Sequence, residues 1–353
     1  MKTISVINVG SENSGVGTIV DAVVEQSDAK AVIASCSPAR TSFVYRGGIS
    51  HQFCQFGSAT LIPDVKTFLE PTSVINPLIM MHEAESLANK GVKDAFQRTF
   101  ISSHCRICTP HHTHYSRLMQ PISGRRDYTG AGIAFTECIY AKDLIIGGKY
   151  LRDKIASLKS NFAEQFSRDS QGKENQINYS LLDELMMDET PLLEHYEKFR
   201  AQAKILAYDE MRDFAEGEPV RVVQGLDWSA SDEVIGVTRT FGVTRGEENK
   251  DLAFLMSDDD NCRLEMANRW LGKPVARVLD LDEVQRNSAG IDRLAVTHCD
   301  KLKGCSTWKL IMNEVEKEIP VTKVIETIEE FVGVPVVIES SGKLSSVKVL
   351  KQK

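Results

Sequence analysis

The chain has 353 residues, of which 42% are hydrophobic, so it is long enough to bury a substantial core. Its formal net charge is -7 and its lysines and arginines are scattered, which argues against a nucleic-acid partner. The apolar run at the N-terminus is too short for a signal peptide, and no apolar stretch reaches the ~18 residues of a membrane span. We therefore expect a cytoplasmic protein with no membrane partner.

The first part of the chain predicts strands that alternate with a helix. Residues 3–9 form an apolar run typical of a buried strand, and a turn rich in glycine and serine follows at residues 10–17. Residues 18–26 have helical spacing, and residues 28–34 begin a second strand. This order favours an α/β fold with a largely parallel central sheet flanked by helices, and a ligand site at the carboxyl ends of the strands.

The clearest helix signal follows a short strand over residues 73–75. Asn76 can cap this helix, Pro77 suits its first position, and Gly91 can end it.

The rest of the chain continues the alternation of helices and strands. Residues 150–215 are polar and helical in tendency. Further apolar runs end at polar or glycine-bearing turns, as parallel strands do, at residues 221–228, 275–281, 293–300 and 334–340. Residues 308–319 and 321–333 are helix candidates between them. We expect a single domain over residues 1–353.

Three polar turns are candidate nucleotide sites. In residues 10–17, backbone N–H groups at a helix N-terminus can face a phosphate, although the usual lysine is missing. In residues 128–133, the Thr129 hydroxyl and neighbouring amides can hold a second phosphate. Asp300 follows an apolar run and can accept two hydrogen bonds from guanine. Plain turns and a helix-capping aspartate are the alternatives.

The eight cysteines are dispersed, which suits reduced thiols, but one cysteine pair has metal-ligand spacing. Cys105 and Cys108 are separated by two residues. The histidines that follow them are His111, His112 and His114. Residues 100–109 also predict a strand, on which positions three apart point to opposite faces and cannot share one ion. A zinc site, and with it a zinc-stabilised interaction protein, stays open as an alternative.

These motifs occur in the order found in adenylosuccinate synthetases, which the chain resembles over residues 3–149 and 217–350. Residues 34–87 are similar to the family's stretch from its Asn-Ala-Gly-His-Thr motif to the strand and helix that begin Val-Ile-Asn-Pro. The later matches are YTGAGI to a Thr-Gly-x-Gly-Ile phosphate loop, VVQGLDW to a Gly-Ala-Gln-Gly strand end, VTHCDKLKG to a Thr-Lys-x-Asp guanine motif and EEFVGVPVVIESSGK to the closing strand and Ser-x-Gly turn. The mainly helical segment at about residues 150–216 matches poorly.

The resemblance implies a ligase of purine nucleotide biosynthesis. Enzymes of this family use GTP to phosphorylate the 6-oxygen of inosine monophosphate (IMP), and aspartate then displaces the phosphate to give adenylosuccinate. The resemblance also implies Mg2+ as a cofactor and GTP (or ATP) as co-substrate. The partners that it implies are a purine nucleoside monophosphate and aspartate, and it implies a homodimer by analogy. The reaction needs a base at N1, an acid or a cation at the 6-oxygen, and Mg2+ at the phosphoryl group.

The resemblance places the catalytic roles on residues that differ from those of the family. Ser11 stands at the position of the base and of a metal ligand, and Val16 and Thr18 replace the loop lysines. Arg40 stands where the family has its catalytic histidine, and Ser37 where it has asparagine. An arginine can stabilise charge on the 6-oxygen, but it cannot donate a proton near neutral pH.

The resemblance also implies the binding residues. For the substrate these are Gly15, Gly17, Thr41, Thr129, Gly130, Gln224, Thr238 and Arg277. For the nucleotide these are Thr297, Asp300, Ser341 and Gly342. His298 replaces the lysine of the guanine motif, and of the arginines that bind aspartate Arg277 is the best positional match.

Three functions are consistent with this pattern. The first is an adenylosuccinate synthetase that acts on IMP with GTP. The second is a 2-aminoadenylosuccinate synthetase that acts on dGMP with ATP, since a serine at the base position also occurs in that viral branch; such an enzyme would work in the host cytoplasm. The third is a catalytically degenerate relative that binds a nucleotide or depends on a partner chain, since the loop lysines and the histidine are replaced.

Overall fold

The computed structural model describes residues 2–9, 15–123, 128–173, 175, 177–224, 231–245 and 274–341. The chain divides into two compact units. The first unit comprises Met1–Val32, Ser42–Gln52 and Glu218–Lys353, and the second comprises Ile33–Thr41 and Phe53–Gly217. The expected single domain stays a prediction.

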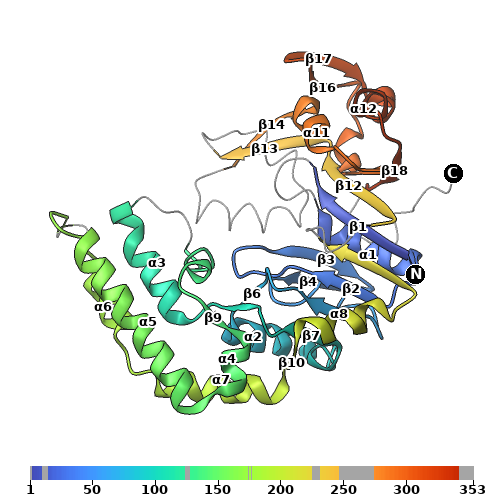
Figure 1. The fold of residues 1–353 in the computed structure, drawn as a ribbon. Coiled ribbons are helices and arrows are strands. Elements are labelled where there is room, and N and C mark those ends of the chain that lie inside the picture. Colours follow the sequence, from blue (N-terminus) through green and yellow to red (C-terminus); the bar gives the residue numbers. More distant parts are fainter. Residues whose placement is uncertain are drawn as a thin grey trace. The chain divides into compact units, whose positions relative to one another are not determined.

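A nine-stranded sheet is the largest element of the fold (Figure 1). In spatial order its strands are β10 (Lys204–Leu206), β7 (Thr99–Ser102), β5 (Lys66–Leu69), β2 (Ala31–Ala34), β11 (Val220–Gln224), β1 (Lys2–Asn8), β12 (Glu233–Arg239), β15 (Arg293–Thr297) and β18 (Val336–Glu339). The pairs β10–β7, β5–β7, β11–β1, β1–β12, β12–β15 and β15–β18 are all parallel. The predicted α/β class with a largely parallel central sheet is confirmed.

Smaller sheets accompany the central one. In the first unit, β13 (Phe241–Arg245), β14 (Pro274–Asp280), β16 (Thr307–Met312) and β17 (Val315–Pro320) form a four-stranded sheet, and β3 (Ser42–Arg46) pairs with β4 (Ile49–Phe53). In the second unit, β6 (Val74–Ile75), β8 (Arg106–Ile107) and β9 (Ile139–Tyr140) form a three-stranded sheet.

The helices of the first unit pack on its strands. α1 (Val16–Gln26) contacts β1, β3 and β11. α11 (Leu281–Asn287) and α12 (Val324–Val332) contact each other, and their buried residues share a core with Leu279, Leu294 and Leu310.

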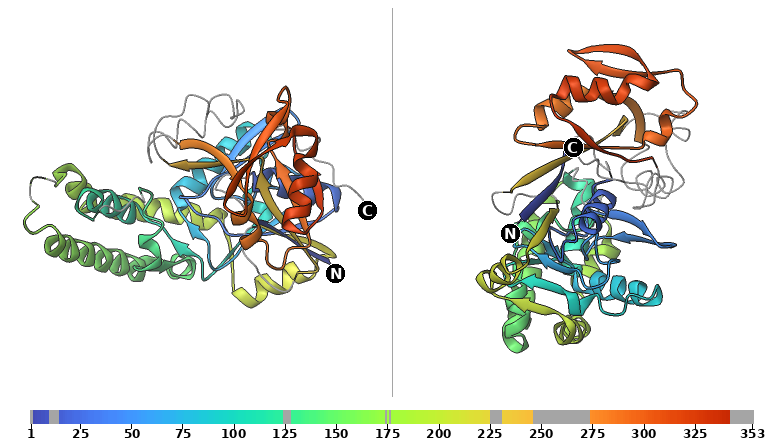
Figure 2. Two further views of the ribbon diagram at one scale, coloured as in Figure 1. Left: turned by 90° about the horizontal axis from the view of Figure 1, so that it is seen from above. Right: turned by 90° about the vertical axis from the view of Figure 1, so that its right-hand side faces the viewer.

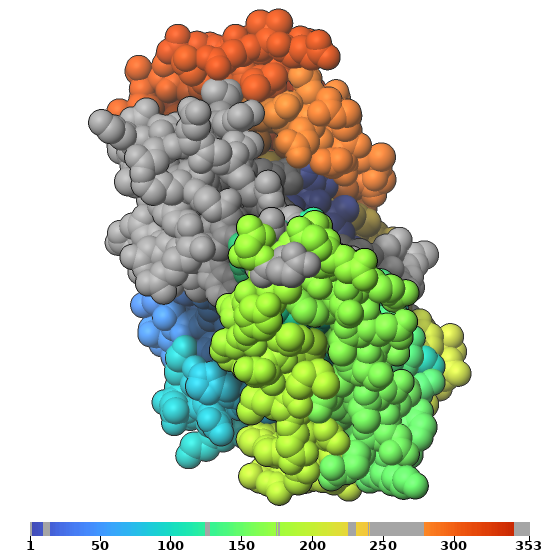
Figure 3. Space-filling view, turned by 90° about the vertical axis from the view of Figure 1, so that its left-hand side faces the viewer, coloured from blue at the N-terminus to red at the C-terminus, as the bar shows by residue number. Residues whose placement is uncertain are grey.

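The second unit is rich in helices, most of them in its later part. They are α2 (Pro77–Asn89), α3 (Pro110–Ser123), α4 (Ala141–Ile146), α5 (Gly148–Asp169), α6 (Tyr179–Leu185), α7 (Thr190–Gln202) and α8 (Tyr208–Glu216). α3 packs against both α5 and α6, and these helices run side by side in Figures 1 and 2. Figure 3 shows the helices from α5 to α7, in green to yellow-green, gathered over one face of this unit. None of the helices that the structure describes could span a membrane.

The capping prediction for α2 is confirmed. The Asn76 side chain accepts hydrogen bonds from the backbone N–H groups of Leu78 and Ile79, both at 3.1 Å. Pro77 is the first helical residue, and Gly91 follows the helix with a φ of 95°. An N-cap side chain satisfies N–H groups that a helix leaves without partners, so this local sequence fixes where the helix begins.

The predicted helix over residues 308–319 is wrong, because these residues form the β16–β17 hairpin. Its two-residue turn places Asn313 and Glu314 at φ values of 53° and 62°. The Asp282 carboxylate holds this turn by accepting both backbone N–H groups, at 2.8 and 2.7 Å. Of the two strands only Leu310 is buried, so the alternation that marks a half-buried strand is weak, and the turn carries no glycine.

The predicted strand over residues 275–281 exists as β14, but it lies in the four-stranded sheet. It pairs antiparallel with β13 and parallel with β16. The apolar run alone did not specify to which sheet the strand belongs.

Candidate functional site

In the first unit, polar residues gather at the carboxyl ends of β12 and β15. Thr238 near the end of β12 is fully buried, and its Oγ1 has no hydrogen-bond partner among the described residues. Thr297 at the end of β15 donates its hydroxyl to the Thr238 carbonyl at 3.3 Å, and the same oxygen lies 2.9 Å from His298 Nδ1. The carboxyl ends of parallel strands are the usual ligand site of such sheets, and a buried hydroxyl there can form a hydrogen bond with a bound ligand.

The turn after β15 carries His298 and Asp300. His298 has a φ of 61°, a left-handed conformation uncommon for a residue with a side chain, and it precedes a short helix at Cys299–Leu302. The Cys299 N–H donates to the Ser340 carbonyl at 2.9 Å, which ties the turn to the end of β18. Asp300 forms an ion pair with Lys301 at 3.5 Å and stays partly exposed, so its carboxylate is accessible to a ligand.

Gly15, at the start of α1, lies at the same strand ends. It has a φ of 85° and caps α1, and a Cβ placed on it would lie 3.5 Å from Thr297 Cγ2. Gly17 is buried in the first turn of α1, where Thr18, which replaces a lysine, donates its hydroxyl to the Gly15 carbonyl at 2.8 Å. The structure therefore brings Gly15 and Thr297 together from opposite ends of the chain.

Of the other site residues predicted for this unit, some lie in the central sheet or directly after it, one lies in another sheet, and two lie outside the described residues. Gln224 ends β11, and its Nε2 donates to Ser42 Oγ at 3.3 Å. Arg277 lies on β14 opposite Gly242, in the four-stranded sheet and not in the central one. Ser341 follows β18 and is exposed. Ser11 and Gly342 lie outside the described residues.

In the second unit, the Thr129–Gly130 loop is tightly fitted to the start of α3. The Thr129 carbonyl accepts the Thr113 hydroxyl at 2.8 Å and the Cys108 thiol at 3.3 Å, and the Thr129 hydroxyl accepts the Ala131 N–H at 3.2 Å. Gly130 has a φ of 78°, and a Cβ on it would lie 2.5 Å from the backbone carbon of His112. The glycine is required by this close approach, so the loop has a fixed shape as a phosphate site needs.

Arg40 and Thr41, also in this unit, end a turn that begins at Ser37. The Arg40 N–H donates to the Ser37 carbonyl at 3.0 Å, and the Ser37 hydroxyl accepts the Ala39 N–H at 3.2 Å. Both Arg40 and Thr41 are exposed, so their side chains are available to a ligand.

Cys105 and Cys108 do not meet at a metal site. Cys105 donates its thiol to the Leu69 and Glu70 carbonyls, whereas Cys108 donates to the Thr129 carbonyl. The residues that the structure describes contain no group of three or more His, Cys, Asp or Glu side chains suited to a metal. The predicted strand over residues 100–109 is also wrong in part: β7 ends at Ser102, and β8, which begins at Arg106, belongs to another sheet.

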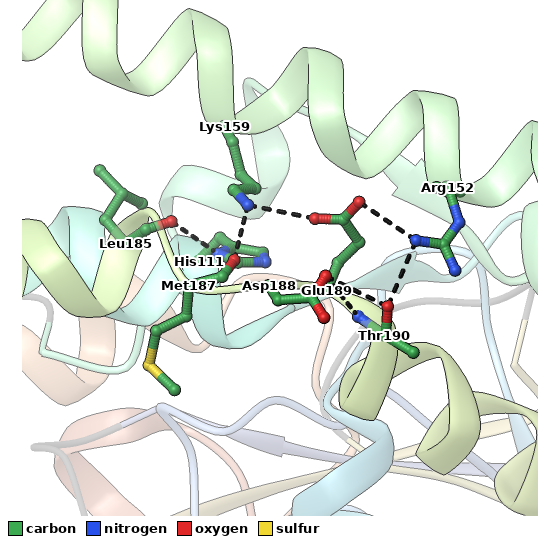
Figure 4. A network of polar contacts seen from close by, with 8 residues as sticks. All are labelled: His111, Arg152, Lys159, Leu185, Met187, Asp188, Glu189 and Thr190. Carbon is green, nitrogen blue, oxygen red and sulfur yellow. Dashed lines mark hydrogen bonds and ion pairs between the residues drawn. The ribbon is translucent and has the colours of Figure 1, made fainter.

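Two histidines of this segment have structural partners instead. His112 Nδ1 accepts the Thr109 N–H at 3.0 Å and its Nε2 lies 2.8 Å from the Glu137 carbonyl. His111 Nδ1 lies 3.1 Å from the Leu185 carbonyl, beside Lys159, which donates to Met187 and Glu189 (Figure 4). This network attaches the α6–α7 connection to α3 and α5.

One group that the sequence analysis missed is Glu70, a buried carboxyl directly after β5. Its signal was a single acidic residue directly after Phe68 and Leu69, where parallel strands present their ligand site.

The comparisons with known proteins agree with this fold. The model of the adenylosuccinate synthetase family matches residues 8–216, more than half of the chain. The chain belongs to the adenylosuccinate synthetase family. Membership of this family supports an assignment as a purine nucleotide ligase, and the match includes the helical segment after residue 150. No curated protein sequence matches the chain.

Solved structures of adenylosuccinate synthetase type share the fold. The fully ligated adenylosuccinate synthetase from Plasmodium falciparum superposes with a TM-score of 0.74 at 14% identity, covering 100% of both chains. The succinoaminodeoxyadenylate synthetase PurZ of cyanophage S-2L, bound to dGMP and to dATP as energy donor, superposes with a TM-score of 0.61 at 10% identity, covering 100% of this chain and 96% of that one.

Proposed function

We propose that the chain joins aspartate to the 6-position of a purine nucleoside monophosphate, with GTP or ATP supplying the phosphoryl group. The observation that carries this proposal is the buried Thr238 hydroxyl, which has no hydrogen-bond partner among the described residues, at the strand ends where Gly15 and Thr297 lie close together. A strand-end site with an unsatisfied hydroxyl is what a nucleotide-binding enzyme of this fold needs before its ligand arrives.

The roles of the individual residues follow from their chemistry. Thr129 and Gly130 would hold the monophosphate of the acceptor, since their loop has a fixed shape. Asp300, in a turn tied to β18, would accept hydrogen bonds from a guanine base. Arg40 would stabilise negative charge on the 6-oxygen, because its guanidinium is exposed and permanently charged.

The described residues fit Mg2+ as an ion held mostly by phosphates. The described residues include no cluster of carboxylates suited to a metal. Mg2+ in nucleotide sites is commonly bound by one or two protein oxygens together with phosphate oxygens and water. Ser11 would supply one such oxygen, and the ion would neutralise charge on the transferring phosphoryl group.

A second candidate acceptor is dGMP, with ATP as the donor. A serine rather than an aspartate stands at the position of the family's base, and the cyanophage enzyme that shares the fold was solved with dGMP and dATP. With dGMP as acceptor, this chain would form a product of the 2-aminoadenylosuccinate type.

Phosphate release tests the proposal directly. The purified chain is incubated with Mg2+ and aspartate, with GTP or ATP, and with IMP or dGMP as acceptor. Aspartate-dependent phosphate release with one acceptor supports the proposal and names the purine. A folded protein that releases no phosphate in any combination would instead be a degenerate, nucleotide-binding or partner-dependent relative.

A further inference from the structure

Glu70, at the carboxyl end of β5 in the second unit, is a buried carboxyl that pairs with no cation among the described residues. Its residue is 6% exposed, and no Lys, Arg or His within the described part of the chain forms an ion pair with it. Its carboxyl group has one hydrogen-bond partner there, the Thr72 hydroxyl. A buried carboxylate without a cation is strongly disfavoured, and burial accordingly raises the pKa of Glu70, while the bond from Thr72 acts in the opposite direction.

The Thr72 hydroxyl connects Glu70 to Ser35. Thr72 Oγ1 lies 2.7 Å from Glu70 Oε1 and 3.1 Å from Ser35 Oγ. A hydroxyl has only one hydrogen to donate, so one of these two bonds must be donated by the partner. Either Ser35 donates to Thr72 and Thr72 to a carboxylate, or a protonated Glu70 donates to Thr72 and Thr72 to Ser35. Burial without a cation favours the second arrangement.

Backbone bonds hold the turn of Glu70 firmly against the end of β2. The Glu70 N–H donates to the Ala34 carbonyl at 3.1 Å, and the Ser73 N–H closes the turn on the Glu70 carbonyl at 2.9 Å. The Cys36 N–H in turn donates to Ser73 Oγ at 3.2 Å. The connection from Glu70 to Ser35 therefore reaches the start of the segment of residues 35–41, which carries Arg40.

Within the part of the chain that the structure describes, the titratable groups around Glu70 supply no compensating charge. Burial raises the pKa values of the Cys36 and Cys105 thiols, which stay neutral, and Cys105 donates its thiol to the Glu70 carbonyl at 3.2 Å. The guanidinium of Arg106 is engaged elsewhere: it donates to the Pro71 carbonyl at 3.1 Å and lies 4.3 Å from the centre of the Phe135 ring. Glu83 also raises the pKa of the Cys36 thiol and so adds no positive charge to these surroundings.

We propose that Glu70 is held as a neutral carboxylic acid that donates through the Thr72 hydroxyl to Ser35, and that it is the proton source for the segment of residues 35–41. This inference rests on the proposed function, in which the family's proton donor is replaced by Arg40, a residue that cannot donate near neutral pH. Glu70 acts through the two hydroxyls, so it is a positioning residue.

In one turnover, one proton passes from Glu70 through the two hydroxyls to the departing phosphate. The O–H bond of Glu70 breaks as its proton passes to Thr72, Thr72 passes its own proton to Ser35, and Ser35 passes its own to the departing phosphate oxygen. The C–O bond between that oxygen and the purine breaks as the amine forms its C–N bond. The amine nitrogen releases one proton to solvent once its C–N bond has formed, and Glu70, left as a carboxylate, takes one proton up from solvent, so no net proton is gained or lost.

Infrared titration tests the protonation of Glu70 without any turnover. The carbonyl band of a protonated carboxylic acid is distinct from the bands of a carboxylate, and subtraction of the Glu70→Gln spectrum isolates the Glu70 band. We expect this band to persist well above the ordinary pKa of glutamate and to shift in frequency in Thr72→Val, which removes the acceptor hydroxyl. A band that disappears at an ordinary glutamate pKa would overturn the inference.

Kinetics test the role as a proton source. Glu70→Gln and Thr72→Val should each lower kcat about 100-fold with little change in KM, since positioned acids contribute roughly that factor. The wild-type kcat should fall as the pH rises through the Glu70 pKa, and this fall should be absent in Glu70→Gln. The control is Glu85→Gln on α2, whose carboxylate is exposed and which should retain wild-type rates.

The two sets of results separate this inference from the proposed function. An active wild type whose kcat and pH profile survive Glu70→Gln contradicts the role of Glu70 and leaves the ligase intact. A wild type that is inactive with every acceptor contradicts the ligase and the role as proton source together, and the infrared titration then decides the protonation of Glu70 by itself.

Discussion

At Thr238, we expect the effect of the hydroxyl on stability to be opposite to its effect on nucleotide binding. Its buried hydroxyl has no partner in the described residues, so Thr238→Val should keep or raise the free energy of unfolding by up to about 1 kcal/mol. If the hydroxyl binds the purine nucleotide, the same substitution should weaken the binding of IMP or dGMP by about 1–3 kcal/mol. Urea unfolding and calorimetric titration measure the two effects.

The matched control for Thr238 is Thr99, which is also buried but donates its hydroxyl to the Ala95 carbonyl at 2.8 Å. Thr99→Val should lower the free energy of unfolding by about 1 kcal/mol and leave nucleotide binding unchanged. Equal affinities of Thr238→Val and the wild type would remove Thr238 from the site.

Asp300 carries the predicted discrimination between nucleotide bases. Its partly exposed carboxylate can accept from N1 and N2 of guanine, whereas adenine offers no such pair of donors. Asp300→Ala should therefore abolish a preference for GTP over ATP, measured as the ratio of the two kcat/KM values. An unchanged ratio would show that Asp300 does not contact the base.

At the scale of the element, the Thr129–Gly130 loop depends on its close approach to α3. Gly130→Ala would place a Cβ 2.5 Å from the His112 backbone at a φ of 78°, so it should lower the free energy of unfolding by several kcal/mol or prevent folding. Gly290→Ala is the control, because Gly290 has a φ of 80° and open space around its Cβ position. That variant should lose only about 1 kcal/mol in urea unfolding. Similar losses in both variants would contradict the packing argument.

Helix α3 should also make the fold sensitive to acid. Burial lowers the pKa of His112 from the ordinary 6.5 to about 4, and its Nδ1 faces the Thr109 N–H, which a protonated ring cannot accept. Between pH 6.5 and 4 the unfolded chain therefore binds more protons, and stability falls as the pH falls, by about 1.4 kcal/mol per pH unit for this group.

Urea unfolding at several pH values within this window measures that dependence. His112→Gln should reduce the slope of stability against pH by one group, because the buried imidazole no longer titrates. A His112→Gln slope equal to that of the wild type would contradict the argument.

The elements that the sequence predicted are those with strong local signals. Asn76 and Pro77 specify the start of α2 through hydrogen bonds that lie within one turn. The β16–β17 hairpin was missed because its turn depends on the distant Asp282 carboxylate, which no local pattern reveals. The position of Arg277 in the four-stranded sheet likewise depends on strand pairing between segments far apart in the chain.

At the scale of the whole molecule, the order of motifs carried more information than any single motif. The glycine turn, the Thr129 loop and the Asp300 turn are each weak signals, but together they indicated the family that the match over residues 8–216 shows. The contact of Gly15 with Thr297 could not be read from the sequence, since it arises only when β1 and β15 lie on either side of β12. The burial of Glu70 is a tertiary property of the same kind.

The most direct test of the ligase assignment is the transfer of nitrogen from aspartate to the purine. The purified chain is incubated with 15N-labelled aspartate, Mg2+, GTP or ATP, and IMP or dGMP, and the nucleotides are analysed by mass spectrometry. We predict a succinylated purine nucleotide that carries the label and forms only when the nucleoside triphosphate is present. The absence of any labelled nucleotide with all combinations, from a protein shown to be folded, would contradict the assignment.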